Sequence, residues 1–270
     1  MTDQTIERKV DFEAPPVVEV VCGVVVEPTP AFSATSFGDL RTRYKDGFPN
    51  TVDQAPLPAP TPQGTVRFEV GSPVLPRVWF KSEDERRLLQ IQQDRFIFNW
   101  RRRDDADEYP TFPDVWDSFT KHYETYKEYL TADGKHPLRE VQYELRYVNH
   151  IPADKVWHGL EDINRVFPDI DWRDNKDRFL PIPRDVRWET RFPLPDGAGV
   201  LLSNAGTARR IDTGELILTL DLLCQGPAGI LEFHRWFDLG HEWIVRGFSD
   251  LTGNEMQTTT WGRKETAHET

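Results

Sequence analysis

The sequence has little cysteine, and it lacks the short motifs that mark common catalytic sites. Cys22 and Cys224 are its two cysteines, and each lies in an apolar, strand-like run. This count excludes a disulfide framework and a cysteine-rich zinc site, so buried, reduced thiols are expected instead. The patterns G-x-S-x-G, G-x-x-x-x-G-K-S/T, G-x-G-x-x-G and H-E-x-x-H do not occur. We therefore assign no catalytic residue and no cofactor from sequence motifs.

Excess positive charge and long apolar runs are also missing. Lys and Arg number 33 against 45 Asp and Glu, which gives a formal net charge of −12. General nucleic-acid binding is therefore disfavoured, because it needs clustered, unneutralised basic side chains. The apolar run at 15–28 is too short to span a bilayer, and no small-residue cleavage site accompanies it. We expect a cytoplasmic protein that does not contact a membrane.

Aromatic and β-branched residues are what the sequence does contain. Nine Trp, sixteen Phe and seven Tyr predict an aromatic-rich core. The run at 15–28 predicts a central strand covered on both faces, followed by a short helix at 37–48 and a proline-rich loop at 49–64. Further strands are predicted at 66–70, 77–81 and 88–100, the last one bent near Gln93 and Asp94.

The clearest amphipathic helix is predicted at 112–130, with one apolar stripe that contains Val115, Phe119, Tyr123, Tyr126 and Leu130. A long strand follows at 138–152, and then a helix at 154–167. Three antiparallel strands are predicted at 186–194, 199–210 and 214–225, before a final helix at 229–253 and a polar tail.

The order of strands followed by one long aromatic helix occurs twice along the chain. It divides the sequence into residues 1–152, an N-terminal α+β half, and residues 153–270, a β-β-β-α half packed intimately on the first. The predicted fold class is α+β, with two related halves and mainly antiparallel sheets that have long helices packed across them.

Several ordered segments carry a family resemblance. They are FEAPPVVEVVCGVVVEP at 12–28, FNW at 98–100, EYPTF at 108–112, ELRYVNHI at 144–151 and the Trp at 261. Together they resemble a sporadically distributed family of uncharacterised bacterial proteins of about this length. The resemblance implies a bacterial cytoplasmic protein that is patchily inherited, and it favours a role in conflict systems such as phage defence. It carries over no catalytic residues.

The segment RRRDDADE, at 101–108, offers a candidate anion site. Guanidinium groups bind phosphate through paired hydrogen bonds, and strand geometry points Arg101 and Arg103 away from Arg102. Arg101 or Arg103 would therefore meet a ligand individually. The alternative is a solvated strand end, because the acids that follow neutralise the arginines.

The strand at 138–152 offers a second candidate. Its alternation places Glu144, Arg146 and His150 on one face, with Glu19 nearby if the first strand is a neighbour. Arg146 and His150 are candidate ligand-binding residues, and a carboxylate with a histidine could also serve acid–base chemistry. The alternative is a ladder of structural ion pairs across strands.

The last predicted helix contains a weak candidate metal site. His234, Asp238 and His241 stand at i, i+4 and i+7, a spacing that could present two imidazoles and one carboxylate to a metal ion. His241 also lies next to an apolar stripe, where a hydrogen-bonded core histidine is the alternative. We assign no metal from this spacing.

These observations favour a non-catalytic binding or adaptor subunit of a bacterial accessory system, with a protein partner encoded nearby. A homo-oligomer is compatible with the sequence. The alternative is a small-molecule or nucleotide-sensing domain whose pocket lies between sheet and helix, where Arg101, Arg103 or Arg146 meets an anionic group. A third alternative is an enzyme with an unfamiliar site around His150 or His241.

Overall fold

The computed structural model describes residues 8–29, 32–58, 75–104, 107–132, 137–172 and 179–267. Within these ranges nine strands form one antiparallel sheet in the order β3-β4-β5-β6-β2-β7-β10-β9-β8. The strands are β2 (Val17–Val26), β3 (Asn50–Gln54), β4 (Arg77–Lys81), β5 (Arg87–Gln92), β6 (Arg95–Arg101), β7 (Glu140–Pro152), β8 (Arg187–Pro193), β9 (Val200–Arg209) and β10 (Leu216–Pro227).

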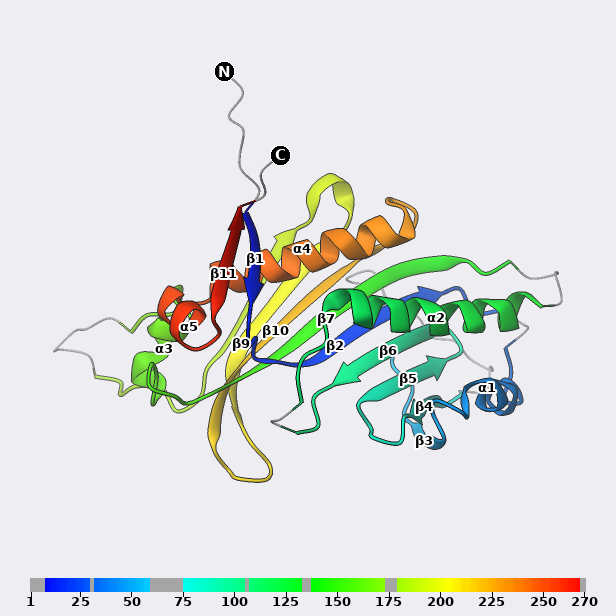
Figure 1. Ribbon diagram of the computed structural model, residues 1–270, viewed down its shortest axis with the longest axis horizontal. Helices are drawn as coiled ribbons and strands as arrows, with labels where there is room; N and C mark the ends of the chain where they lie inside the picture. The colour runs from blue at the N-terminus through cyan, green and yellow to red at the C-terminus, as the bar shows by residue number, and fades with distance from the viewer. Residues whose placement is uncertain are drawn as a thin grey trace, which may run out of the picture.

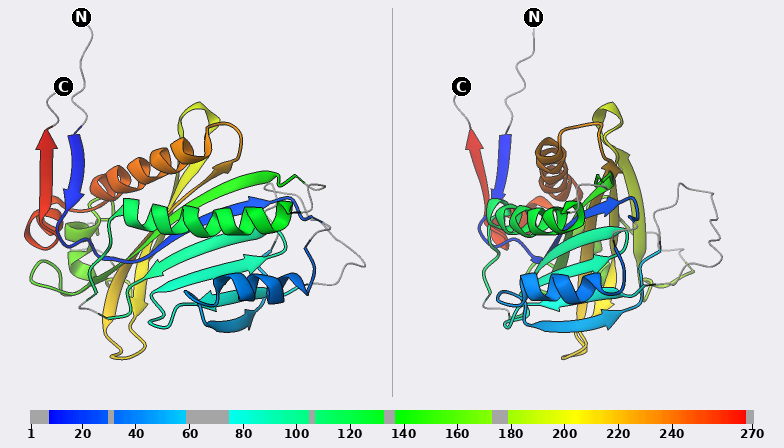
Figure 2. Two further views of the ribbon diagram at one scale, coloured as in Figure 1. Left: turned by 45° about the vertical axis from the view of Figure 1, so that its right-hand side comes forward. Right: turned by 90° about the vertical axis from the view of Figure 1, so that its right-hand side faces the viewer.

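Two long helices cover one face of this sheet. Helices α2 (Phe112–Thr131) and α4 (Phe233–Leu251) lie on the same side of the strands (Figures 1 and 2). The smaller helices are α1 (Ser36–Tyr44), η1 (Leu160–Asp162), α3 (Ile163–Val166), η2 (Pro195–Gly197) and α5 (Asn254–Thr259). The predicted α+β class, with a mainly antiparallel sheet and long helices packed across it, is confirmed.

The two halves of the chain follow the same path. Strand β2 leads through α1 to the outer strand β3. Strands β4, β5 and β6 then fill the positions between β3 and β2, and β6 is followed by α2. Strand β7 likewise leads through α3 to the outer strand β8. Strands β9 and β10 then fill the positions between β8 and β7, and β10 is followed by α4. Pairing of β2 with β7 joins the halves. By this strand order β7 begins the second half; the division at residue 152 stays a prediction.

A separate ribbon lies beside the helices. Strand β1 (Arg8–Phe12) pairs antiparallel with β11 (Arg263–Ala267), so segments near the two ends of the chain lie side by side (Figure 1). Sequence patterns did not predict either strand, because their partners are about 250 residues apart along the chain and neither segment alternates clearly.

The main core fills the space between the helices and the sheet with aromatic rings. Phe119 of α2 lies with its ring centroid 6.2 Å from that of Phe96 on β6 and 5.3 Å from that of Phe237 on α4. Trp236 packs on Tyr143 of β7 at 5.5 Å, and its indole N–H donates to the carbonyl of Ala198 at 2.8 Å. This core confirms the expected aromatic stripe on α2, whose buried residues include Val115, Phe119, Tyr123, Tyr126 and Leu130.

The strand predicted at 88–100 is wrong: it is a hairpin of β5 and β6 with its turn at Gln93 and Asp94. The carboxylate of Asp94 accepts hydrogen bonds from Gln92 Nε2 at 3.0 Å and Arg95 Nε at 3.1 Å. These side-chain bonds hold a tight reversal that contains neither Gly nor Pro, which are the residues that normally mark a turn in a sequence.

The helix predicted at 154–167 is also wrong over its first six residues, since helical structure forms only in η1 and α3. The carboxylate of Asp154 accepts hydrogen bonds from the backbone N–H groups of Val156 at 2.7 Å and Trp157 at 3.2 Å. Such local bonds compete with helix formation. In addition, β3 occupies part of the loop predicted at 49–64, α5 and β11 form in the predicted polar tail, and the strand predicted at 66–70 lies outside the described residues.

No helix in the described ranges is both long enough and apolar enough to cross a bilayer.

Candidate functional site

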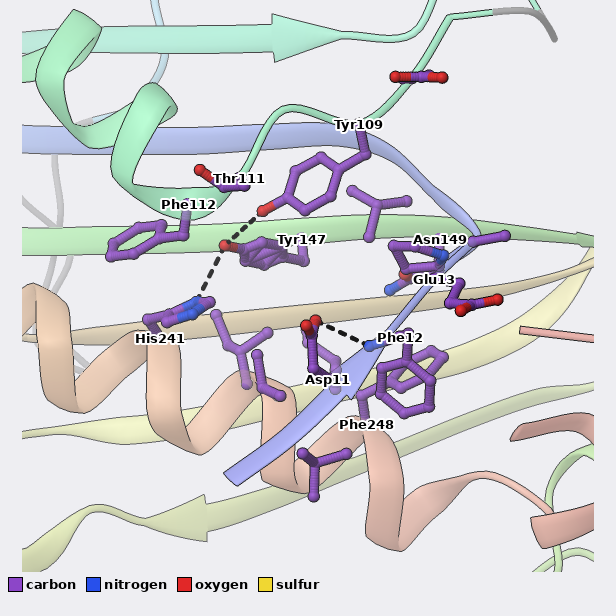
Figure 3. Close-up of a pocket in the computed structure, with 18 of the residues that line it drawn as sticks. Asp11, Phe12, Glu13, Tyr109, Thr111, Phe112, Tyr147, Asn149, His241 and Phe248 are labelled. Carbon is purple, nitrogen blue, oxygen red and sulfur yellow. Dashed lines mark hydrogen bonds between the residues drawn. The ribbon is translucent and has the colours of Figure 1, made fainter. Parts of the chain in front are cut away.

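A cavity of about 920 Å³ lies where the start of α2, the middle of α4 and the centre of the sheet meet the β1–β11 ribbon (Figure 3). This volume is within the range of roughly 300–1,000 Å³ that is usual for small-molecule sites. Both halves of the chain contribute to its walls, which include Val10, Phe12, Val17, Tyr109, Phe112, Tyr147, Asn149, Leu222, His241, Ile244, Val245 and Phe248.

The ribbon forms one wall of the cavity and is attached to α4 by aromatic contacts. The ring of Phe12 packs edge-to-face on Phe248, with centroids 5.2 Å apart, and on Trp261 at 6.5 Å. At the rim, Glu13 forms an ion pair with Lys264 at 2.8 Å. These contacts bring residues near both ends of the described chain to the same site.

A chain of hydrogen-bonding groups crosses the cavity. The hydroxyl oxygens of Tyr109 and Tyr147 are 3.1 Å apart, and the hydroxyl of Tyr147 lies 3.1 Å from Nδ1 of His241 (Figure 3). Burial raises the pKa of Tyr109 and that of Tyr147 above the ordinary phenol value. Both tyrosines are therefore neutral near pH 7 and can donate as well as accept hydrogen bonds.

Helix α2 begins at the cavity and places a flat ring there. The ring of Phe112 stacks on the imidazole of His241, with centroids 4.1 Å apart and planes 9° from parallel. The carboxylate of Asp114 accepts hydrogen bonds from the N–H of Thr111 at 3.0 Å and from its hydroxyl at 2.6 Å, which fixes the first turn. The helix start is thus a rigid wall of the cavity.

Two arginines of the 101–103 run are paired on the other face of the sheet or at the surface. Arg101 Nε donates to Glu19 at 3.0 Å, and the guanidinium lies over the ring of Trp79 at 5.1 Å. Arg103 donates to Glu85 at 2.7 Å. Neither lines the cavity. Both arginines are paired, but with Glu19 and Glu85 rather than with the acids that follow them in the sequence.

Arg102, which sequence reasoning set aside, is the arginine of this run that lines the cavity. It continues the alternation of Phe96, Phe98 and Trp100, whose side chains face the helices. Its backbone N–H donates to the carbonyl of Val18 at 2.7 Å. The buried Nε atom has no hydrogen-bond partner within the described chain. The aromatic face of the strand was the signal that could have placed this side chain.

Arg146 and His150 lie across the sheet from the cavity, on the face that the long helices leave uncovered. Arg146 donates two hydrogen bonds to the carboxylate of Asp221, and these raise its pKa. Burial lowers the pKa of His150, and the charge of Arg210 acts in the same direction. Glu19 shares this face because β2 pairs with β7. This part of the predicted ligand set therefore does not meet the cavity.

The three candidate metal ligands on α4 lie in different environments. His241 lines the cavity beside Phe112 and Tyr147, whereas His234 and Asp238 are exposed. Within the described ranges, no three His, Cys, Asp or Glu side chains are grouped so that they could hold a metal ion. His241 instead has the contacts expected of a histidine packed at the edge of a core.

Three of the five segments that carry the family resemblance line this cavity. Residues 12–15 and 17, Tyr109 and Phe112, and Tyr147 and Asn149 line it, while Trp100 packs edge-to-face on Tyr109 with centroids 5.4 Å apart. The resemblance itself stays a prediction, because no family model and no curated protein matches the chain.

Proposed function

We propose that this protein is a small-molecule-sensing domain whose ligand occupies the cavity between the ribbon, α2, α4 and the sheet. The observation that carries the proposal is the cavity itself. It combines a volume of about 920 Å³ with predominantly apolar walls and with polar groups that come from several elements. This combination is typical of small-molecule sites.

The polar groups of the cavity are held in place before a ligand arrives. Tyr147 is bonded to both Tyr109 and His241, and Asn149 donates to the carbonyl of Leu220 at 2.9 Å. Groups that are already ordered lose little conformational entropy on binding, so each contact contributes more to affinity. The preorganised hydrogen bonds therefore support recognition as the role of the site.

A thermal-shift screen with metabolites and nucleotides tests the proposal. A ligand that binds only the folded state stabilises it by about 2.7 kcal/mol at 100 times its Kd, which corresponds to roughly 5–10 °C in Tm. We expect at least one compound to produce such a shift in the wild-type protein. The substitution Val245→Trp places an indole in the cavity and should abolish that shift.

A matched control separates loss of the cavity from loss of folding. Val52 lies on the outer strand β3, 40% exposed and outside the cavity, so Val52→Trp introduces the same side chain elsewhere. This variant should keep the ligand-induced shift. The proposal fails if no compound stabilises the wild type, or if Val245→Trp still folds and responds as the wild type does.

The adaptor role in a bacterial accessory or defence system is the second candidate, and one surface feature favours it. Phe179, Leu180 and Ile182, just before β8, are 96%, 64% and 42% exposed. Clustered exposed apolar side chains mark protein-interaction surfaces. Cys22 and Cys224 are both buried and free, which supports the cytoplasmic location that this role needs.

Mixing the protein with the products of neighbouring genes tests the adaptor role. A partner protein should co-elute with the wild type and should be lost in a Phe179→Ser, Leu180→Ser double variant. Phe192→Ser serves as the control, because Phe192 is also exposed but lies on β8. The absence of a stable complex with any neighbour would count against this role.

A further inference from the structure

Within the described ranges, some of the charged side chains around the cavity form ion pairs or hydrogen bonds with other groups of the protein, and others do not. Glu13 is paired with Lys264 at 2.8 Å, and Asp107 is paired with Arg86 and accepts the backbone N–H of Arg103 at 2.9 Å. Glu13 and Asp107 are thus paired with basic side chains, and the other two acids that line the cavity, Asp11 and Glu108, are exposed to solvent. A ligand is not needed to balance them.

Arg102 differs from these acids, because part of its charged group is buried. The residue lines the cavity, and its buried Nε atom lacks an acceptor within the described part of the chain. A buried donor without a partner costs about 1–3 kcal/mol, and more when the group is charged. An anionic ligand group would remove this cost and gain a charge-assisted hydrogen bond. The buried Nε atom of Arg102 therefore favours a ligand that brings a hydrogen-bond acceptor, and an anionic acceptor most of all.

The aromatic walls of the cavity favour a flat, apolar body. Phe112 and His241 are stacked 9° from parallel, and the rings of Phe12, Phe248 and Tyr109 complete this lining. Aromatic rings pack well on one another in offset and edge-to-face geometries. The two tyrosine hydroxyls, 3.1 Å apart, add hydrogen-bonding groups for a polar substituent.

We propose that the cavity binds a planar aromatic acid, whose carboxylate or phosphate is held by Arg102 and whose ring lies among the aromatic walls. This inference rests on the proposed small-molecule function and specifies its ligand. Arg102 acts as the specificity-determining residue, because it discriminates an acid from its neutral isostere.

Ligand-observed NMR titration with four probes tests the inference. The probes are phenylacetate, phenyl phosphate, the neutral isostere phenylacetamide and the cationic phenethylamine. We expect phenylacetate or phenyl phosphate to bind the wild type about tenfold or more tightly than phenylacetamide, as a charge-assisted hydrogen bond predicts. Which of the two acids binds better identifies the anionic group.

Substitutions in the arginine run provide the matched comparison. Arg102→Gln should reduce the preference for the acid over the amide to within about twofold. Arg102→Lys should retain part of it, because it keeps the charge but loses the paired geometry. Arg103→Gln is the control, since Arg103 is exposed and bonded to Glu85. The Tm of each variant shows whether it is folded.

Each other outcome overturns the inference. It fails if phenethylamine or phenylacetamide binds as well as the acids, if no probe binds the wild type, or if folded Arg102→Gln keeps the wild-type preference. The proposed function survives these results when the broader screen finds a neutral or cationic ligand that Val245→Trp excludes. The proposed function fails when no ligand is found at all, or when folded Val245→Trp responds to the ligand as the wild type does.

Discussion

The hydroxyl of Tyr147 on β7 lies 3.1 Å from Nδ1 of His241 on α4, and this contact ties the centre of the sheet to the second long helix. The same hydroxyl lies 3.1 Å from that of Tyr109, which precedes α2. One phenol therefore connects the sheet to structural elements from both halves of the chain. Deleting the hydroxyl of Tyr147 should therefore lower both the stability of the fold and the affinity for a cavity ligand.

Replacing Tyr147 with Phe keeps the ring and deletes the shared hydroxyl. We expect a loss of about 1–2 kcal/mol in the free energy of unfolding, because two part-buried polar groups, on Tyr109 and His241, lose a hydrogen-bond partner. Urea denaturation measures this loss. Tyr129→Phe is the control, because the Tyr129 hydroxyl bonds Asp39 at an exposed site, and its effect should stay below about 0.5 kcal/mol. Equal effects of the two variants would contradict a special role for Tyr147.

Local patterns predicted the elements that the cavity depends on. The alternation along 138–152 placed Tyr147 and Asn149 on the face that lines the cavity, and Arg146 and His150 on the other, as observed. The period of α2 likewise placed its apolar stripe against the sheet. These predictions succeeded because each depends only on the geometry of one strand or helix.

Such local patterns could not predict the location of the cavity. It needs the pairing of β1 with β11 and the crossing of α2 near α4, which bring Phe12 to Phe248 and Phe112 to His241. These contacts join segments more than 100 residues apart, and no local period encodes them. Arg102 was missed for a related reason. Whether its side chain lines a cavity depends on which distant elements cover that face of the sheet.

Lowering the pH should destabilise the protein through His122. Burial among the rings of Tyr44, Phe48 and Phe98 lowers the pKa of His122 from 6.5 to about 4. Above pH 6.5 the imidazole is neutral in both the folded and the unfolded state. Between pH 6.5 and 4 only the unfolded chain takes up the proton, so the free energy of unfolding falls as the pH is lowered.

We expect His122 to contribute a loss of about 2 kcal/mol between pH 7.5 and pH 5. Denaturation of His122→Gln at the two pH values should show a correspondingly smaller loss than the wild type. His158→Gln should follow the wild type, because His158 is exposed. A pH dependence that His122→Gln leaves unchanged would show that other groups cause it.

Truncating Phe12 to Ala should loosen the ribbon without unfolding the main sheet. Phe12 connects β1 to Phe248 and Trp261, and loss of a half-buried ring costs on the order of 2 kcal/mol. We expect faster hydrogen exchange at the backbone amides of β1 and β11, and weaker binding of any cavity ligand. Phe192→Ala, on the exposed face of β8, should change neither. Unaltered exchange in the ribbon would mean that other contacts hold it.

Reversing the charge of Arg101 distinguishes the sequence-based site from the structural one. The sequence predicted that Arg101 or Arg103 meets a ligand individually, and charge reversal there would then abolish binding without unfolding the protein. Arg101 instead bonds Glu19, whose carboxylate also accepts a hydrogen bond from Asn99 at 2.8 Å, on the face away from the cavity. We expect Arg101→Glu to lower stability by about 1–3 kcal/mol, because it places two carboxylates together.

Ligand affinity of the folded Arg101→Glu protein should remain within about twofold of the wild type, whereas Arg102→Glu should lower it by at least about tenfold. Titration calorimetry with the ligand found in the screen, below the Tm of each variant, measures both values. The reverse result, with affinity lost in Arg101→Glu and kept in Arg102→Glu, would move the binding site to the uncovered face of the sheet, where Arg146 and His150 also lie.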